Sequence, residues 1–109
     1  MIEDIFEMIS TAGTARAKYI EAIAFAKKEA YEESKKLMKE GTECFHAAHK
    51  LHAKMLAEES QKMESEEHAG AASLILVHAE DQMMCAETFR LVAEEFIDVY
   101  KQLKKFAGA

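Results

Sequence analysis

The sequence contains no proline and no tryptophan, and its 109 residues include only four glycines and two cysteines. Proline and glycine are the residues that most disfavour a helix interior, so little in this chain interrupts a helix. Half of the residues are apolar, and Ala, Glu, Lys, Met and Leu predominate. This composition predicts an all-α fold, and the length fits a single domain over residues 1–109. Cys44 and Cys85 lie far apart on expected helical faces, which favours two free buried thiols over a disulfide.

Clusters of cationic residues are also missing. Fourteen basic residues face twenty acidic ones, the net charge is −6, and no more than two basic residues are adjacent. Binding to nucleic acid requires a coherent positive face, so no nucleic-acid partner is expected. The N-terminus MIEDIFEMIS carries acids in place of the cationic start of a signal peptide, and the longest apolar run, around residues 71–77, is too short to span a bilayer. We therefore expect a cytoplasmic protein.

Apolar periodicity predicts three helices. They run from Ile2 to the high twenties, from near Ala30 to about Met63, and from Ala69 or Ala72 to Phe106, with Gly108 beyond the end of the last. Gly13 falls inside the first helix, where glycine costs about 1 kcal/mol relative to alanine. We therefore expect a neighbouring helix to approach closely at Gly13.

The third helix carries two adjacent apolar stripes. The first follows a heptad rule through Ile75, His78, Gln82, Cys85, Phe89, Val92, Phe96, Val99, Leu103 and Phe106. The second contains Leu74, Val77, Asp81, Met84, Thr88 and Leu91. Two stripes predict burial on two sides, so we expect one to pack on the other two helices of the chain and the other to meet a different partner.

Three polar residues within these stripes are the candidates for chemistry. A neutral imidazole such as that of His78 attacks phosphorus readily, and a partly buried position keeps it neutral near pH 7. Gln82, one turn further on, can donate its amide to a phosphoryl oxygen. In a symmetric trimer built along this helix, three Asp81 carboxylates would converge, and a hard cation would neutralise them. Spacing alone leaves open a purely structural role for His78.

The remaining histidines give weaker signals. Glu43 and His46 have the Glu-x-x-His spacing of a di-iron helix, but the sequence contains no second pair of this kind, so no ferritin-like site is expected. His46 and His68 are expected on the surface, and His49 and His52 partly buried.

The motif LVHAEDQMM, residues 76–84, resembles the signature VHAQDHLM of the lactose/cellobiose-type IIA component of the bacterial phosphoenolpyruvate-dependent sugar phosphotransferase system. In that signature the first histidine is the phosphorylated residue. The segments ISTAGTARAKYIEAI, residues 9–23, and AHKLHAKMLAEES, residues 48–60, are similar to other parts of the family, so the resemblance covers nearly the whole chain.

This resemblance implies an antiparallel up-down-up three-helix bundle that assembles into a homotrimer of nine helices. His78 would accept phosphate from the histidine-containing phosphocarrier protein and pass it to a cysteine of the IIB component, with only an indirect link to the membrane component IIC. Asp81 from three subunits would hold a divalent cation, Mg²⁺ by preference, on the trimer axis. The sugar would be a β-linked disaccharide such as lactose, cellobiose or chitobiose.

Three residues depart from the family pattern. Glu80 and His52 stand where the family has glutamine, and Gln82 stands where it has a second histidine. A carboxylate at Glu80 would repel an incoming phosphoryl group if it pointed into the site. The alternative is thus a catalytically degenerate or non-enzymatic trimeric helical module with an interaction or regulatory role.

Overall fold

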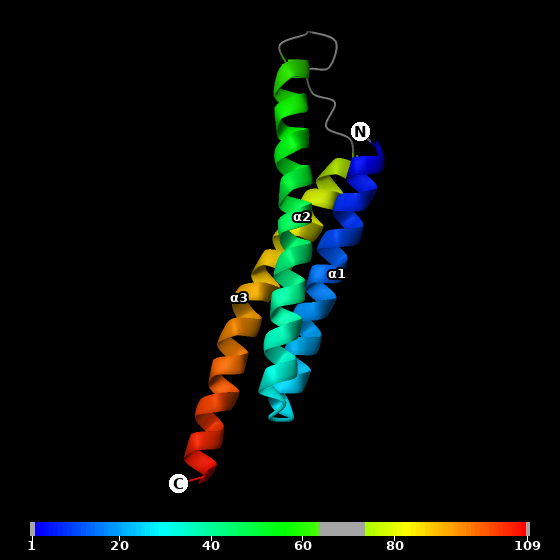
Figure 1. Cartoon of the computed structure of the whole chain (residues 1–109). Coiled ribbons are helices and arrows are strands. Elements are labelled where there is room, and N and C mark those ends of the chain that lie inside the picture. The colour runs from blue at the N-terminus through cyan, green and yellow to red at the C-terminus, as the bar shows by residue number, and fades with distance from the viewer. Residues whose placement is uncertain (1, 64–73, 109) are drawn as a thin grey trace.

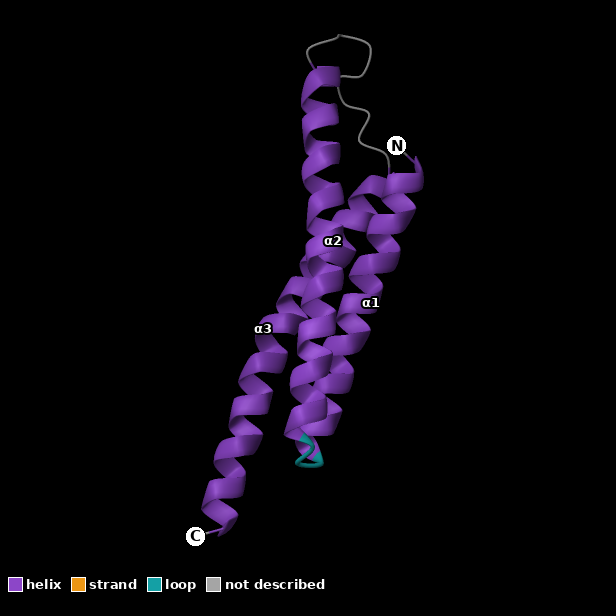
Figure 2. Cartoon of the chain, in the orientation of Figure 1, coloured by secondary structure: helices purple, strands orange, loops and turns teal. Residues whose placement is uncertain are grey.

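The computed structural model describes residues 2–63 and 74–108, and all the regular structure in these ranges is helical. The helices are α1 (Ile2–Lys27), α2 (Tyr31–Met63) and α3 (Leu74–Gly108) (Figures 1 and 2). The predicted all-α fold with three helices is confirmed. Gly108 is the last residue of α3, not a residue beyond its end, and the start predicted at Ala69 or Ala72 lies outside the described residues. None of the helices described here is both long enough and apolar enough to cross a membrane.

The three helices form an elongated up-down-up arrangement about 66 Å long. The first, α1, packs along both of the others, and α3 runs parallel to it (Figure 1). The C-terminal half of α3 diverges from the α1–α2 pair and ends beyond the turn that joins them (Figure 1). Contacts with the turn and with the start of α2 nevertheless continue to Lys104, which pairs with Glu29 and lies over the ring of Tyr31.

A three-residue turn, Lys28 to Ala30, joins α1 to α2. The amide of Ala30 donates to the Phe25 carbonyl (2.9 Å), and the amide of Glu29 donates to the Ala26 carbonyl (3.0 Å). This pair of hydrogen bonds is the Schellman motif, in which the residue after the helix takes a left-handed conformation and is usually glycine. Here it is Glu29, with φ of 67°.

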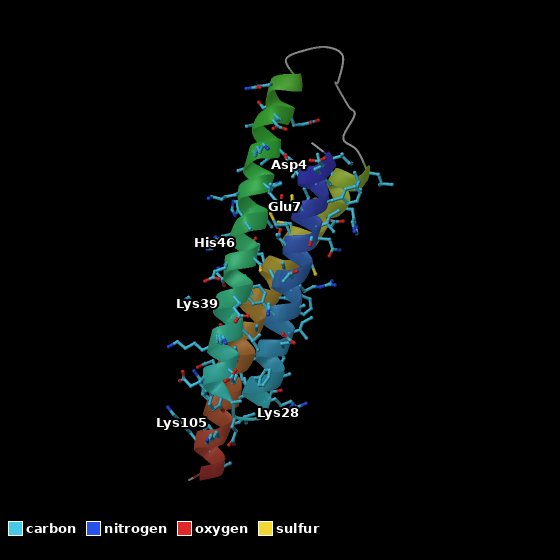
Figure 3. The ribbon with its side chains drawn as sticks, turned by 45° about the vertical axis from the view of Figure 1, so that its right-hand side comes forward. Asp4, Glu7, Lys28, Lys39, His46 and Lys105 are labelled. Carbon is cyan, nitrogen blue, oxygen red and sulfur yellow. The ribbon has the colours of Figure 1, made fainter. Side chains whose placement is uncertain are left out.

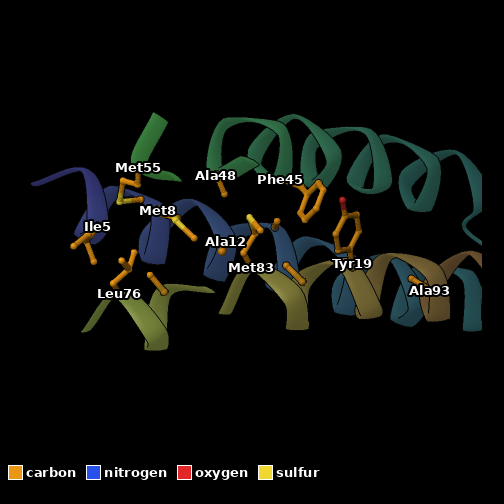
Figure 4. Packing of buried hydrophobic residues seen from close by; sticks show 13 residues of the cluster. Ile5, Met8, Ala12, Tyr19, Phe45, Ala48, Met55, Leu76, Met83 and Ala93 are labelled. Atoms are coloured by element: carbon orange, nitrogen blue, oxygen red, sulfur yellow. The ribbon is translucent and has the colours of Figure 1, made fainter. Parts of the chain in front are cut away.

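The inner face of α3 is neither of the two predicted stripes. The buried residues of α3 are Leu76, Ala79, Met83, Ala86 and Ala93, and they pack against α1 and α2 (Figure 4). Of the two predicted stripes, only Ile75 and Phe89 of the first pack against this core, and they are partly buried, so the prediction that one whole stripe packs on the other helices is wrong. The reason is the size of the side chains, since three alanines let α3 lie close to α1, where Ala12 and Ala15 are also buried.

The close approach of two helices occurs at Gly41 of α2, not at Gly13. A Cβ atom at Gly41 would lie 2.7 Å from Cε1 of Tyr19, whereas a Cβ atom at Gly13 would meet nothing within 4 Å. Tyr19 is fully buried and its hydroxyl lies 3.1 Å from the Thr42 hydroxyl. The expectation for Gly13 is therefore wrong within this chain, and Gly41 is what admits the ring of Tyr19.

Two ion pairs link the exposed flanks of α1 and α2. Nζ of Lys54 donates to Asp4 (2.9 Å), and Nζ of Lys18 lies 3.0 Å from the Glu40 carboxylate. The hydrogen bond from Lys54 holds the pKa of Asp4 below its usual value, and that from Lys18 does the same to the pKa of Glu40. Such exposed pairs add little to stability, but they mark the sides on which α1 and α2 face each other.

Candidate functional site

The predicted site residues lie on the outward side of α3, near its N-terminal end. His78 and Asp81 are exposed and Gln82 is partly buried. His78 is thus more accessible than the partly buried position that its apolar stripe predicted. None of the three makes a hydrogen bond to another residue in the described ranges, so their polar atoms remain available to a partner or ligand.

His78 and Asp81 line one open pocket of about 490 Å³. Its other lining residues are Leu74, Ile75 and Val77, all apolar. His78 and Asp81 are three residues apart, so they are neighbours on the helix surface, and Gln82 follows one turn after His78. A larger groove of about 630 Å³ runs between α2 and α3, but none of the predicted site residues lines it. The candidate functional site is therefore the smaller pocket, where an imidazole and a carboxylate lie among apolar side chains.

Glu80 does not point toward this pocket. Its carboxylate lies 3.3 Å from Nε2 of His52 on α2, and His52 can donate the hydrogen bond. Since two residues turn the chain by about 200° in a helix, Glu80 and His78 project from nearly opposite sides of α3. His52 and Glu80, two of the residues that depart from the family pattern, are therefore in contact with each other, and the sequence alone does not predict this contact.

The other histidines lie as follows. His46 and His49 are exposed and His52 is partly buried, so the expected partial burial of His49 is wrong. Figure 3 shows His46 on the side of α2 that faces away from α1. His68 lies outside the described residues. Cys44 and Cys85 are free thiols, and both are half-buried where buried thiols were expected.

A metal ion would need ligands from more than one chain. In residues 2–63 and 74–108, no three His, Cys, Asp or Glu side chains of a single chain gather as metal ligands do. Asp81 nevertheless has a suitable setting, because its carboxylate is an oxygen ligand on an exposed surface beside apolar Val77 and Met84. The residues present therefore fit a hard cation only where several copies of Asp81 meet.

Both predicted stripes of α3 are largely exposed in the single chain. Leu74 is 86% exposed and Phe106 is 81% exposed. The other large apolar residues exposed on this helix are Val77, Met84, Leu91, Val92, Phe96, Val99 and Leu103. Contiguous apolar surface of this extent marks an interaction site in a water-soluble protein.

Comparison with known proteins gives consistent matches over nearly the full length. Residues 3–101 match the sequence family described as "PTS system, Lactose/Cellobiose specific IIA subunit". A lichenan-specific phosphotransferase enzyme IIA component of Bacillus subtilis is 31% identical over 109 residues, which cover 100% of this chain and 94% of that protein. A lactose-specific EIIA component of Staphylococcus epidermidis is 30% identical over 97 residues, or 89% of this chain and 88% of that one.

A solved structure agrees with these matches. The crystal structure of the cellobiose-specific enzyme IIA of the phosphotransferase system from Bacillus anthracis superimposes with a TM-score of 0.84 at 32% sequence identity. The superposition covers 94% of this chain and 90% of that chain. The similarity therefore extends to the fold as well as to the sequence.

Proposed function

The chain belongs to the lactose/cellobiose-specific IIA family of the sugar phosphotransferase system, and on this premise we propose that it carries a phosphoryl group on His78. The donor is the histidine-containing phosphocarrier protein and the acceptor is a cysteine of the IIB component. The membrane component IIC is served only indirectly, through IIB. The observation that supports this proposal is the exposed imidazole of His78, which has no hydrogen-bond partner among the described residues and lies at an apolar pocket on α3.

The transfer exchanges one bond to phosphorus for another. A ring nitrogen of neutral His78 attacks the phosphorus atom of the donor's phosphohistidine, and the bond between phosphorus and the donor's imidazole breaks. In the second step a thiolate of IIB attacks the phosphorus on His78, and the imidazole leaves with its electron pair. Gln82 lies one helical turn from His78, so its amide N–H can donate to a phosphoryl oxygen in both steps.

The exposed half of α3 supports a homotrimer in which these helices meet. A second and third copy of the chain would cover the apolar stripes and bring three Asp81 side chains together. A divalent cation, Mg²⁺ by preference, would be held by those three carboxylates and would supply positive charge that offsets their mutual repulsion. Asp81 acts in this arrangement as a structural ligand.

The sugar imported by the pathway is inferred from the relatives. Their names specify lactose, lichenan and cellobiose. We propose a β-linked disaccharide for this chain as well. Nothing in the site has to contact that sugar, because His78 exchanges phosphate with proteins only.

Removal of the imidazole tests this function directly. His78→Gln should remain folded, because His78 is exposed and outside the core, and it should accept no phosphate from enzyme I, phosphocarrier protein and phosphoenolpyruvate. Intact-protein mass should show one added phosphoryl group on the wild type, and the label should be lost in mild acid but not in base. His46→Gln is the matched control, since His46 is also exposed but lies on α2.

Phosphate on His78→Gln would contradict the assignment. A wild type that takes no phosphate from a competent donor would favour the alternative, a helical module without transferase activity.

A further inference from the structure

The contact between His52 and Glu80 joins the helix that carries His78 to the rest of the bundle. Nε2 of His52 lies 3.3 Å from Oε1 of Glu80, and the side chains are 19% and 40% exposed. Within residues 2–63 and 74–108 it is the one hydrogen bond between side chains that connects α2 to α3. It lies two residues from His78 along α3.

This contact lies close to the residue whose direction it would set. His78 is exposed, and it makes no hydrogen bond within the described residues. The direction of its side chain therefore depends on the orientation of the part of α3 that carries it.

The apolar packing of α3 gives limited control over its rotation. Of its five buried residues, three are alanines, which offer little shape to interlock with α1, and one is Met83, whose side chain adapts easily. A rotation of α3 about its axis would change the direction of His78. Because Glu80 and His78 project from nearly opposite sides, attachment of Glu80 to α2 turns His78 outward.

We infer that His52 is a positioning residue for phosphoryl transfer in this chain. By holding Glu80 to α2 it steadies this part of α3 and fixes the direction in which His78 meets the donor and the acceptor. This inference rests on the proposed function of His78, since His52 itself touches no substrate.

The test combines a structural readout with an activity readout on the full-length protein. His52→Leu and Glu80→Leu each remove the hydrogen bond while they retain a side chain of similar length. In both variants the amides of residues 78–82 should exchange with deuterium about threefold to tenfold faster, the range expected for one lost hydrogen bond. The second-order rate constant for phosphorylation by the phosphocarrier protein should fall by about the same factor.

Two double variants separate positioning from general packing. His52→Leu with Glu80→Leu should be no slower than either single variant, because the one contact is already lost. His52→Gln with Glu80→Gln should exchange and transfer at rates within about twofold of the wild type, because two amides can also hydrogen-bond. His49→Leu is the matched control on α2, where the side chain is exposed, and both of its rates should be unchanged.

The following results would contradict the inference. Unchanged exchange in His52→Leu means that the contact does not hold the helix, and faster exchange with unchanged transfer means that it does not position His78. Slower transfer that the Gln/Gln variant fails to restore means that the loss comes from packing. A wild type that accepts no phosphate overturns the proposed function and the positioning role together, while the exchange measurements still decide whether the contact holds the helix.

Discussion

At the scale of single residues, small side chains form most of the inner face of α3, and large ones lie on its outer side. Ala12, Ala15, Ala79, Ala86 and Ala93 are fully buried, while Phe96, Leu103 and Phe106 are exposed. A ranking of positions by hydrophobicity therefore selects the wrong face of α3. It also misses Ser34, which is fully buried because its hydroxyl donates to the Ala22 carbonyl (2.7 Å). A hydrogen bond of this kind, from one helix to another, cannot be read from periodicity.

Gly13 and Gly41 make a matched pair for mutagenesis. Gly41→Ala should lower the free energy of unfolding by about 1–3 kcal/mol, because the new Cβ overlaps the buried ring of Tyr19. Gly13→Ala should raise it by about 1 kcal/mol, because the position is open and alanine favours the helix. Urea denaturation followed by circular dichroism measures both changes. A loss of stability for Gly13→Ala would indicate that another chain approaches α1 at that point.

At the scale of elements, both ends of α1 and the start of α2 could be predicted to within a few residues, because no proline breaks the helices and their apolar periodicity is regular. The rotation of α3 about its own axis could not be predicted, because apolar residues lie on several sides of this helix and the pattern does not say which side meets the same chain. The motif placed His78, Asp81 and Gln82 on one helix, as the structure has them, while their roles stay predictions. The contact between His52 and Glu80 could not be predicted from the sequence, since the two residues are 28 positions apart and lie on different helices.

The turn between α1 and α2 contains a residue in a strained backbone conformation, and a substitution can relieve this strain. Glu29 has φ of 67°, a conformation that costs an L-residue about 1 kcal/mol and glycine almost nothing. Glu29→Gly should raise the free energy of unfolding by about 0.5–1 kcal/mol, measured in urea. Glu29→Ala is the control, because it also loses the exposed ion pair to Lys104 but keeps the strain, and it should give no gain.

At the scale of the whole molecule, the exposed half of α3 predicts self-association. Sedimentation equilibrium at micromolar concentration should give about three times the 12.3 kDa chain mass. Phe96→Glu should shift the distribution toward the monomer, because a charge in the apolar contact would be buried without a partner. Lys50→Glu, an exposed change on the outer side of α2, should leave the mass unchanged. A monomeric wild type would remove the basis for the proposed trimer.

The assembled molecule should also respond to divalent cations through Asp81. A chelator should lower the melting temperature of the wild type, because three neighbouring carboxylates then repel one another without a counter-charge. Asp81→Leu should remain trimeric and melt at the same temperature with and without chelator. Wild-type melting that ignores the chelator, with no change in Asp81→Leu, would show that the three carboxylates do not meet.

Because the outer surface of α3 is apolar, the stability of the protein should depend on its concentration. A chain that leaves many large apolar side chains of one helix exposed gains the free energy of burying them only by mass action, when other copies are present. The melting temperature of the assembly should then rise with total protein concentration, and a cell that makes few copies would hold more of them unfolded than one that makes many. For such a protein the level of expression is part of what determines whether the phosphate carrier exists at all.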